Sequence, residues 1–215
     1  MQPSAPRSFR LGLLLLALFA VLTFLVESGL TAAWDRTLLL DVLPWRTPGR
    51  TTFFQAVSYL GVGEFAIPAG LLICLALRLR GLTRSAKFFA WVTLGGWAFN
   101  LLLKQTIARA RPDVIPHLGR GGWFTYPSGH SMVSPLVYGL GAILLAELLT
   151  RTPARRAVVA LGVAASAGVA LARIYLGVHY PSDVLGGLLA GCGWGCFWWG
   201  LKPPVEPAVD RGAAN

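Results

Sequence analysis

Residues 104–183 decide the fold, because three short polar clusters alternate there with long apolar runs. The clusters read KQTIARARP at residues 104–112, PSGH at residues 127–130 and RIYLGVHYPSD at residues 173–183. The apolar run that follows the second cluster extends to Leu149 and has the length of a membrane-spanning helix. Ionisable side chains at the ends of such runs are costly unless they serve a function. The clusters are therefore the candidate functional site.

The composition of the whole chain indicates a membrane protein rather than an ordinary soluble domain. Of its 215 residues, 55% are hydrophobic and only 13% are charged, and the mean hydropathy is +0.61. The net charge of +10 raises nucleic-acid binding as an alternative. The basic residues lie in clusters between apolar runs, however, which is typical of membrane-protein loops. We expect no nucleic-acid partner.

The apolar segments predict an all-α integral membrane protein, a six-transmembrane-helix bundle with an interfacial helix after the first span. The expected spans cover residues 11–26, 59–77, 88–103, 128–149, 157–172 and 184–201. We expect residues 1–202 to form a single transmembrane domain and residues 203–215 a short, disordered cytoplasmic tail. A cleaved signal peptide competes with the first span, but sixteen unbroken apolar residues exceed the ~7–15 of a signal core.

The distribution of basic residues predicts the orientation. Six spans place both termini on one side, and that side carries eleven of the nineteen Lys and Arg residues. An excess of Lys and Arg marks the cytoplasmic side. We expect a multi-pass protein of the cell (inner or plasma) membrane with cytoplasmic termini. All three polar clusters then face the extracytoplasmic side.

Small residues inside the spans have structural interpretations. Gly187, Gly191 and Gly195 recur every fourth residue, a spacing that lets helix backbones approach closely. Packing within the bundle is the preferred use, and homodimerisation is the alternative. The three cysteines lie inside apolar runs and behave as small hydrophobes, so we expect neither a metal site nor a disulfide.

The first polar cluster predicts a paired cation site. Lys104 and Arg111 are seven residues apart, and Pro112 disfavours helix only at the residue before it. We expect the helix of the third span to continue to Arg111, so that both cations project from one face toward one small anion, while Arg109 points elsewhere. The alternative is a pair of cations that snorkel at the end of a span.

The second and third clusters supply an anion site and a candidate nucleophile. Ser128 is a favoured N-cap, and the free N–H groups of a helix start that contains Gly129 bind anions. His130 then lies beside the bound anion. His179 and Asp183 are four residues apart, and a carboxylate that accepts from one imidazole nitrogen makes the other nitrogen a better nucleophile.

Taken together, these groups are the parts that phosphoryl transfer requires. Arg173 adds a further fork of donors for phosphate oxygens. One histidine can attack phosphorus, the other can protonate the leaving oxygen, and the cations can hold the remaining oxygens. The sequence offers no carboxylate cluster suited to Mg²⁺, so we expect neither a metal nor another cofactor.

The three clusters resemble the motifs of the type 2 phosphatidic acid phosphatase superfamily, whose soluble relatives are the vanadium haloperoxidases. The family motifs are Lys, six residues, Arg-Pro; then Pro-Ser-Gly-His; then Ser-Arg, five residues, His, three residues, Asp. They match at Lys104–Pro112, at Pro127–His130 and at Arg173, His179 and Asp183. Ala172 stands where the family usually has Ser, and we expect a reduced rate or an altered substrate preference from the missing hydroxyl.

The resemblance implies roles for individual residues. His179 is the implied nucleophile, Asp183 its orienting partner and His130 the general acid. The implied phosphate cradle consists of Lys104, Arg111, Ser128, Gly129 and Arg173. In the connection 113–126 we expect contacts to the substrate head group, the alternative being an aromatic belt at the interface. The candidate residues are His117, Arg120 and Trp123.

The implied activity belongs to the bacterial membrane branch of that superfamily. It is the hydrolysis of a lipid phosphate or diphosphate of the isoprenyl diphosphate, phosphatidic acid or phosphatidylglycerophosphate type, through a phosphohistidine and without a metal. A membrane phosphotransferase that uses the same phosphohistidine is the nearest alternative. A non-catalytic anion-binding or transport protein is the alternative from another class, but transport charges belong near the membrane midplane rather than at span ends.

Overall fold

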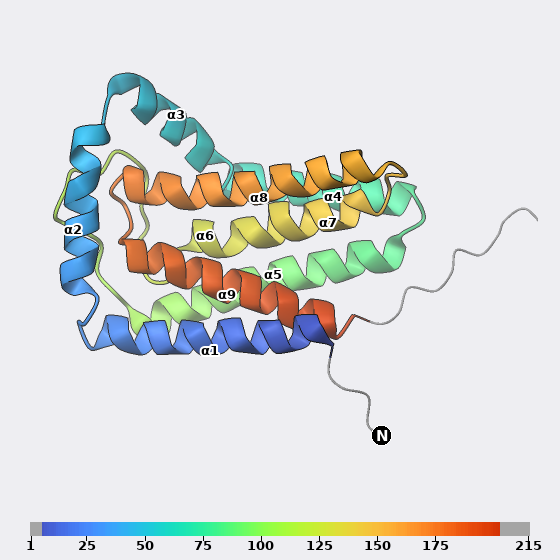
Figure 1. Cartoon of the computed structure of the whole chain (residues 1–215), viewed down its shortest axis with the longest axis horizontal. Coiled ribbons are helices and arrows are strands. Elements are labelled where there is room, and N and C mark those ends of the chain that lie inside the picture. Colours follow the sequence, from blue (N-terminus) through green and yellow to red (C-terminus); the bar gives the residue numbers. More distant parts are fainter. Residues whose placement is uncertain (1–5, 203–215) are drawn as a thin grey trace, which may run out of the picture.

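The computed structural model describes residues 6–202, and every regular element within that range is a helix (Figure 1). The elements are α1 (Arg7–Glu27), α2 (Ala32–Val42), η1 (Leu43–Trp45), α3 (Pro48–Tyr59), α4 (Gly63–Leu79), α5 (Thr83–Ile107), α6 (Gly129–Ser134), η2 (Pro135–Leu140), α7 (Gly141–Ala146), α8 (Thr152–Tyr175) and α9 (Pro181–Gly200). The expected all-α class is confirmed. The tail expected at residues 203–215 lies outside the described range.

Among residues 6–202, four helices are long and apolar enough to cross a membrane: α1, α5, the continuous stretch Gly129–Ala146 and α8. A fifth candidate is the pair of α3 and α4, which is bent by 49°. The expected sixth span, α9, has 20 residues and packs along α1, but it is not among these candidates. An integral membrane bundle is confirmed, and length and composition identify up to five of the six expected spans.

Residues 28–57 are more structured than the expected long connection with one short helix. Thr47 caps α3 by accepting a hydrogen bond from the backbone N–H of Arg50, and Pro48 occupies the first helical position. The other helix of this region, α2, lies across one end of the long helices (Figure 1). It buries Asp35 and exposes Trp34. This placement agrees with the expected interfacial helix.

The third span ends earlier than expected. The helix α5 stops at Ile107, because Ala108 adopts a left-handed conformation with φ of 48° and donates its N–H to the carbonyl of Lys104. The expectation that Lys104 and Arg111 share one helical face is therefore wrong. Arg111 belongs to the irregular segment that follows, where contacts of its side chain with the backbone of other segments outweigh a continued helix.

Close backbone contacts hold α9 against α6. A Cβ atom added to Gly187 would lie 2.5 Å from the carbonyl oxygen of Ser128, and one added to Gly191 would meet the carbonyl of Met132. A Cβ atom added to Gly195 would lie 3.2 Å from the side chain of Leu136 in η2. The three glycines thus serve packing within the chain, which is the preferred expectation.

The arrangement brings four helix ends together. The C-terminal ends of α5 and α8 and the N-terminal ends of α6 and α9 all lie at the end of the bundle that α2 crosses (Figure 1). Each of the three polar clusters is at or next to one of these ends. The fold therefore gathers residues from positions 104–183 at one end of the membrane-spanning bundle.

Candidate active site

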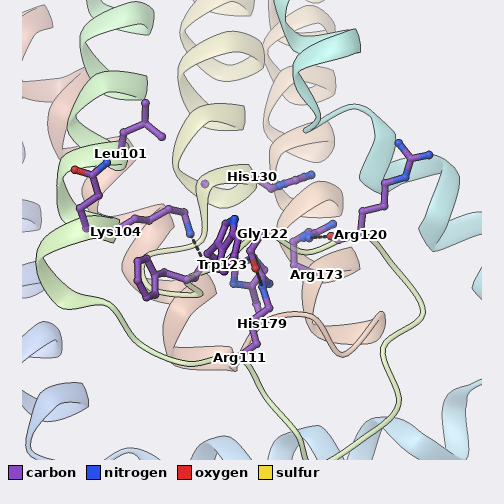
Figure 2. Close-up of a pocket in the computed structure, with 12 residues that line it drawn as sticks. Leu101, Lys104, Arg111, Arg120, Gly122, Trp123, His130, Arg173 and His179 are labelled. Atoms are coloured by element: carbon purple, nitrogen blue, oxygen red, sulfur yellow. Dashed lines mark hydrogen bonds between the residues drawn. The ribbon is translucent and has the colours of Figure 1, made fainter.

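The three polar clusters meet in one cavity of about 420 Å³ (Figure 2). Both histidines of the expected catalytic set, His130 and His179, line it. The other lining residues are Leu101, Lys104, Gln105, Arg111, Arg120, Gly122, Trp123, Phe124, Gly129 and Arg173. One cavity therefore contains two imidazoles and several cations, as the sequence predicts.

The cations of the cavity come from separate segments. Figure 2 shows Lys104 entering from α5 and Arg173 from α8 on the opposite side, with Arg111 between them. The Arg173 residue is only 2% exposed, and its Nη1 donates to the hydroxyl oxygen of Ser58 at 2.7 Å. Its Nε is buried without a partner in the described part of the chain. A buried guanidinium with an unused donor is suited to an anion.

The segment 120–125 holds these cations in place. Three of its backbone carbonyls accept hydrogen bonds from the cations. The carbonyl of Phe124 accepts from Lys104 Nζ at 2.9 Å, and that of Gly122 accepts from Arg111 Nε at 2.5 Å. The carbonyl of Arg120 accepts from Arg173 Nη2 at 2.7 Å. A Cβ atom on Gly121 would lie 2.8 Å from Cζ of Arg111, so a side chain there would displace the guanidinium from its present position. The sequence did not predict that this connection orients the cations.

His179 and Asp183 lie next to each other, and a third residue, Thr125, bridges them. Thr125 Oγ1 lies 2.8 Å from His179 Nδ1 and donates to Asp183 Oδ2 at 2.5 Å, while Nδ1 and Oδ2 themselves are 3.5 Å apart. A hydroxyl has one proton, and Thr125 donates it to the Asp183 carboxylate. The hydroxyl oxygen of Thr125 must therefore accept a hydrogen bond from Nδ1–H of His179. The network thus assigns the proton to Nδ1 and leaves Nε2 unprotonated.

The environment of His179 keeps its free nitrogen available. Arg111 Nη1 lies 3.5 Å from Nε2, and because a guanidinium only donates, it faces a lone pair there. Burial, and then the charges of Arg173 and Arg111, lower the pKa of His179 well below its usual value. The imidazole is therefore neutral at neutral pH.

His130 occupies the first turn of α6 above Arg173 (Figure 2). A Cβ atom on Gly61 would lie 2.5 Å from Cδ2 of His130, so the turn between α3 and α4 packs directly on this ring. The Nε2 atom of His130 is buried and has no partner among residues 6–202. Such an atom in a cavity wall is free to exchange a proton with a bound ligand.

The start of α6 forms as predicted, although Ser128 does not line the cavity. Ser128 caps the helix by accepting hydrogen bonds from the backbone N–H and the hydroxyl of Ser131, at 3.4 Å and 3.0 Å. Gly129 is in the cavity wall, and a Cβ atom there would lie 2.9 Å from Oδ1 of Asn100. The helix start is thus close to Lys104, with the half-buried Gly129 in the cavity wall.

The three expected head-group residues separate in the structure. Arg120 and Trp123 line the cavity, and Trp123 is 94% exposed. His117 lines a second cavity of about 520 Å³, which shares Arg120 and Arg173 with the first. Ala172 is fully buried in α8 and lines neither cavity.

Sequence reasoning missed the residues behind the cavity. Arg109 does not line the cavity, in agreement with the expectation that it points elsewhere, but its guanidinium contacts both Asp183 and Asp35. Thr125 bridges His179 and Asp183. These partners are 54 to 74 residues apart in sequence, so no spacing rule connects them. The residue type of Asp35 does not single it out in the sequence, because Arg36 and Asp41 are charged residues of the same helix.

Comparisons with known proteins agree with the motifs. A model of the PAP2 superfamily matches residues 69–205. Phosphatidylglycerophosphatase B of Bacillus subtilis is 29% identical over 175 residues, which are 80% of this chain and 85% of that protein. Undecaprenyl-diphosphatase BcrC of Bacillus subtilis is 31% identical over 159 residues, which are 69% of this chain and 76% of that protein.

The fold comparison leads to the same family. The crystal structure of a transmembrane PAP2-type phosphatidylglycerolphosphate phosphatase from Bacillus subtilis superposes with a TM-score of 0.81 and 26% sequence identity. The superposition covers 88% of this chain and 94% of that one. With the family motifs gathered around one cavity and the family model matched over more than half of its length, this chain belongs to the PAP2 superfamily.

Proposed function

We propose that this protein is a membrane phosphatase that hydrolyses the terminal phosphate of a lipid mono- or diphosphate, with His179 as the nucleophile. The observation that carries the proposal is that His179, whose Nδ1 is bound to Thr125, lines a cavity together with His130 and the cations Lys104, Arg111 and Arg173. Names of relatives support the reaction class, since they are phosphatases of phosphatidylglycerophosphate, undecaprenyl diphosphate and lipid A.

In the first step, His179 Nε2 attacks phosphorus. A P–N bond forms, the bond from phosphorus to the lipid oxygen breaks, and His130 gives its proton to that leaving oxygen. The positive charge that develops on the phosphorylated imidazole is stabilised by Asp183 through Thr125, which accepts from Nδ1–H. Lys104 and the two arginines hold the equatorial oxygens of the phosphoryl group.

In the second step, water attacks the phosphohistidine. His130, now unprotonated, takes a proton from the water, the P–N bond breaks, and inorganic phosphate is formed. His179 returns to the neutral tautomer with its proton on Nδ1. The two steps together consume one water and release one lipid alcohol, or one lipid monophosphate when the substrate is a diphosphate.

The cavity is suited to a lipid at its rim. Leu101 of α5 is 43% exposed and Trp123 is 94% exposed, and both line the cavity beside Lys104. Apolar and aromatic side chains at a membrane interface accommodate an acyl or isoprenyl chain near its polar end. The phosphate then reaches the cations while the lipid tail stays in the bilayer.

We further propose that residues 1–202 act as one domain in the cell membrane, with the cavity at the extracytoplasmic face and both termini in the cytoplasm. The excess of Lys and Arg on the side of the termini supports this orientation. The substrate phosphate is then processed at the outer leaflet.

The test is phosphate release by the purified full-length protein from a panel of lipid mono- and diphosphates in mixed micelles. We expect release by the wild type and none above background by His179→Ala, with both proteins present at equal amounts in the membrane fraction. Phosphate release by His179→Ala at the wild-type rate would contradict the assignment of His179 as the nucleophile. Analysis of products in the presence of an alcohol distinguishes the alternative, since a phosphotransferase would make a phosphorylated acceptor instead of inorganic phosphate.

A further inference from the structure

A buried ion-pair system continues behind His179 and Asp183. The guanidinium of Arg109 joins two carboxylates, with Nη1 at 2.6 Å from Asp183 Oδ1 and Nη2 at 2.8 Å from Asp35 Oδ2. Both carboxylates are 0% exposed, and the Arg109 side chain is 18% exposed. Three segments distant in sequence, α2, the connection after α5 and the start of α9, converge on these contacts.

Asp35 holds the start of α9 as well as Arg109. Its Oδ1 accepts from the backbone N–H of Ser182 at 2.9 Å, and its Oδ2 accepts from the Ser182 hydroxyl at 2.6 Å. The Ser182 hydroxyl oxygen in turn accepts from Arg109 Nη1 at 2.7 Å. Ser182 directly precedes Asp183 in the sequence. The bonds to Ser182 therefore fix the position of the backbone from which the Asp183 side chain extends.

Asp183 is constrained on both of its oxygens. Oδ1 receives the Arg109 contact, while Oδ2 accepts from Thr125 at 2.5 Å and from the backbone N–H of Tyr180 at 2.7 Å. Arg109 also lies over the ring of Tyr180, with Cζ 4.4 Å from the ring centroid. The carboxylate can therefore turn away from Thr125 only if Arg109 moves.

Apolar packing would not fix the direction of a carboxylate in this way. A buried carboxylate needs a partner, and a guanidinium that binds two carboxylates at once has one favourable geometry. The arrangement positions Asp183, which through Thr125 determines the tautomer of His179. The ion pairs are thus linked to the reacting nitrogen through two further side chains.

We propose that Arg109 and Asp35 are positioning residues of the reaction: Arg109 keeps Asp183 turned toward Thr125 and His179, and Asp35 keeps Arg109 in place. This inference rests on the proposed phosphatase function. Neither residue lines the cavity, so neither touches the substrate. Their loss slows the chemical step and leaves phosphate binding unchanged.

The test compares Asp35→Asn, Arg109→Gln and Arg109→Lys with two matched controls. The controls are Asp41→Asn and Arg36→Gln, which change exposed residues of the same helix α2. Steady-state kinetics with one lipid phosphate give kcat and KM, and inhibition by inorganic phosphate gives the affinity of the cavity. Size-exclusion chromatography of each variant gives the folded fraction, to which kcat is normalised.

We expect kcat to fall about 10- to 100-fold in Asp35→Asn and Arg109→Gln, as for other residues that orient reacting groups, with KM and phosphate inhibition within about twofold of wild type. Arg109→Lys, which keeps the charge, recovers part of the loss. The double variant Asp35→Asn with Arg109→Gln loses no more than the worse single variant, because both act through Asp183.

The controls and the wild type separate the possible failures. A normalised kcat of Asp35→Asn and Arg109→Gln equal to that of the controls Asp41→Asn and Arg36→Gln overturns the inference. A rise in KM and in the phosphate inhibition constant with kcat unchanged also overturns it, because the residues would then act in binding. A wild-type protein that releases no phosphate overturns the proposed function instead.

Discussion

The hydroxyl oxygen of Thr125 lies 2.8 Å from Nδ1 of His179. This contact places a neutral side chain where a direct bond between His179 and Asp183 is expected from their spacing. The hydroxyl transmits the orientation of the carboxylate to the imidazole, because it accepts from the ring and donates to Asp183 at 2.5 Å. The carboxylate of Asp183 can thus orient the imidazole of His179 without a direct hydrogen bond between them.

Removal of this hydroxyl tests its role. Thr125→Val keeps the shape of the side chain, but it leaves Nδ1–H and the carboxylate without their shared partner. We expect kcat to fall about 10- to 100-fold, with the KM for a lipid phosphate changed by less than about threefold. Thr125→Ser retains the hydroxyl and serves as the control, with activity near that of the wild type. Equal losses in the two variants would point to packing of the methyl group instead.

The role of His130 predicts a dependence on the leaving group. A general acid matters most when the leaving oxygen is a poor leaving group, so His130→Ala should lose about 10²- to 10⁴-fold of kcat/KM on a lipid alkyl phosphate. The loss should be smaller on an aryl phosphate such as p-nitrophenyl phosphate, measured with the same preparation. If both substrates lose activity equally, His130 does not protonate the leaving oxygen.

The lowered pKa of His179 predicts the behaviour of the acid limb of the pH profile. The nucleophile must be unprotonated, and burial with the charge of Arg173 lowers the pKa well below the usual histidine value. Activity that depends on neutral His179 therefore persists as pH falls through the usual histidine range. Arg111→Gln removes one nearby cation, so the pKa rises and the acid limb of kcat/KM moves to higher pH. An unchanged limb would contradict the assignment.

Removal of metal ions should leave the activity intact. The proposed site holds the phosphate with Lys104, Arg111 and Arg173, and it requires no ion to neutralise the phosphoryl oxygens. We expect phosphate release after dialysis against EDTA to stay within about twofold of the untreated protein. Strict dependence on added Mg²⁺ would show that the cations are not sufficient.

The packing of α9 against α6 predicts a stability effect away from the cavity. A Cβ atom on Gly191 would meet the backbone carbonyl of Met132, which cannot move without shifting α6. We expect Gly191→Ala to lower the stability by about 1–3 kcal/mol, measured as a lower Tm in detergent. Gly49→Ala is the matched control, because nothing lies within 4 Å of its Cβ position. Equal Tm values for the two variants would contradict the contact.

The sequence predicted the parts of the site that depend on local order along the chain. Apolar runs of spanning length end in polar clusters, so alternation across the membrane brings Lys104, His130 and His179 to one end of the bundle. The cap at Ser128 was also predictable, because the preference for serine there arises from local hydrogen bonding.

The remaining features depend on contacts between distant segments. The helix α5 ends at Ile107 rather than near Pro112, and nothing in the residue type of Ala108 indicates that it adopts a left-handed conformation. Arg109 meets Asp35 across 74 residues, and Thr125 meets His179 across 54. Such pairs follow from how α2 and the connection 108–128 fold over the helix ends, which the pattern of apolar residues does not specify.

The most direct test of the account is to trap the covalent intermediate. The full-length protein is mixed with a lipid phosphate carrying ³²P in its terminal phosphate, quenched in alkali within the first turnover and digested for mass spectrometry. Label that is stable to base, labile to acid and located on His179 is the predicted result. Label on another residue, or phosphate release without any labelled protein at every quench time, would contradict the central claim that His179 is the nucleophile.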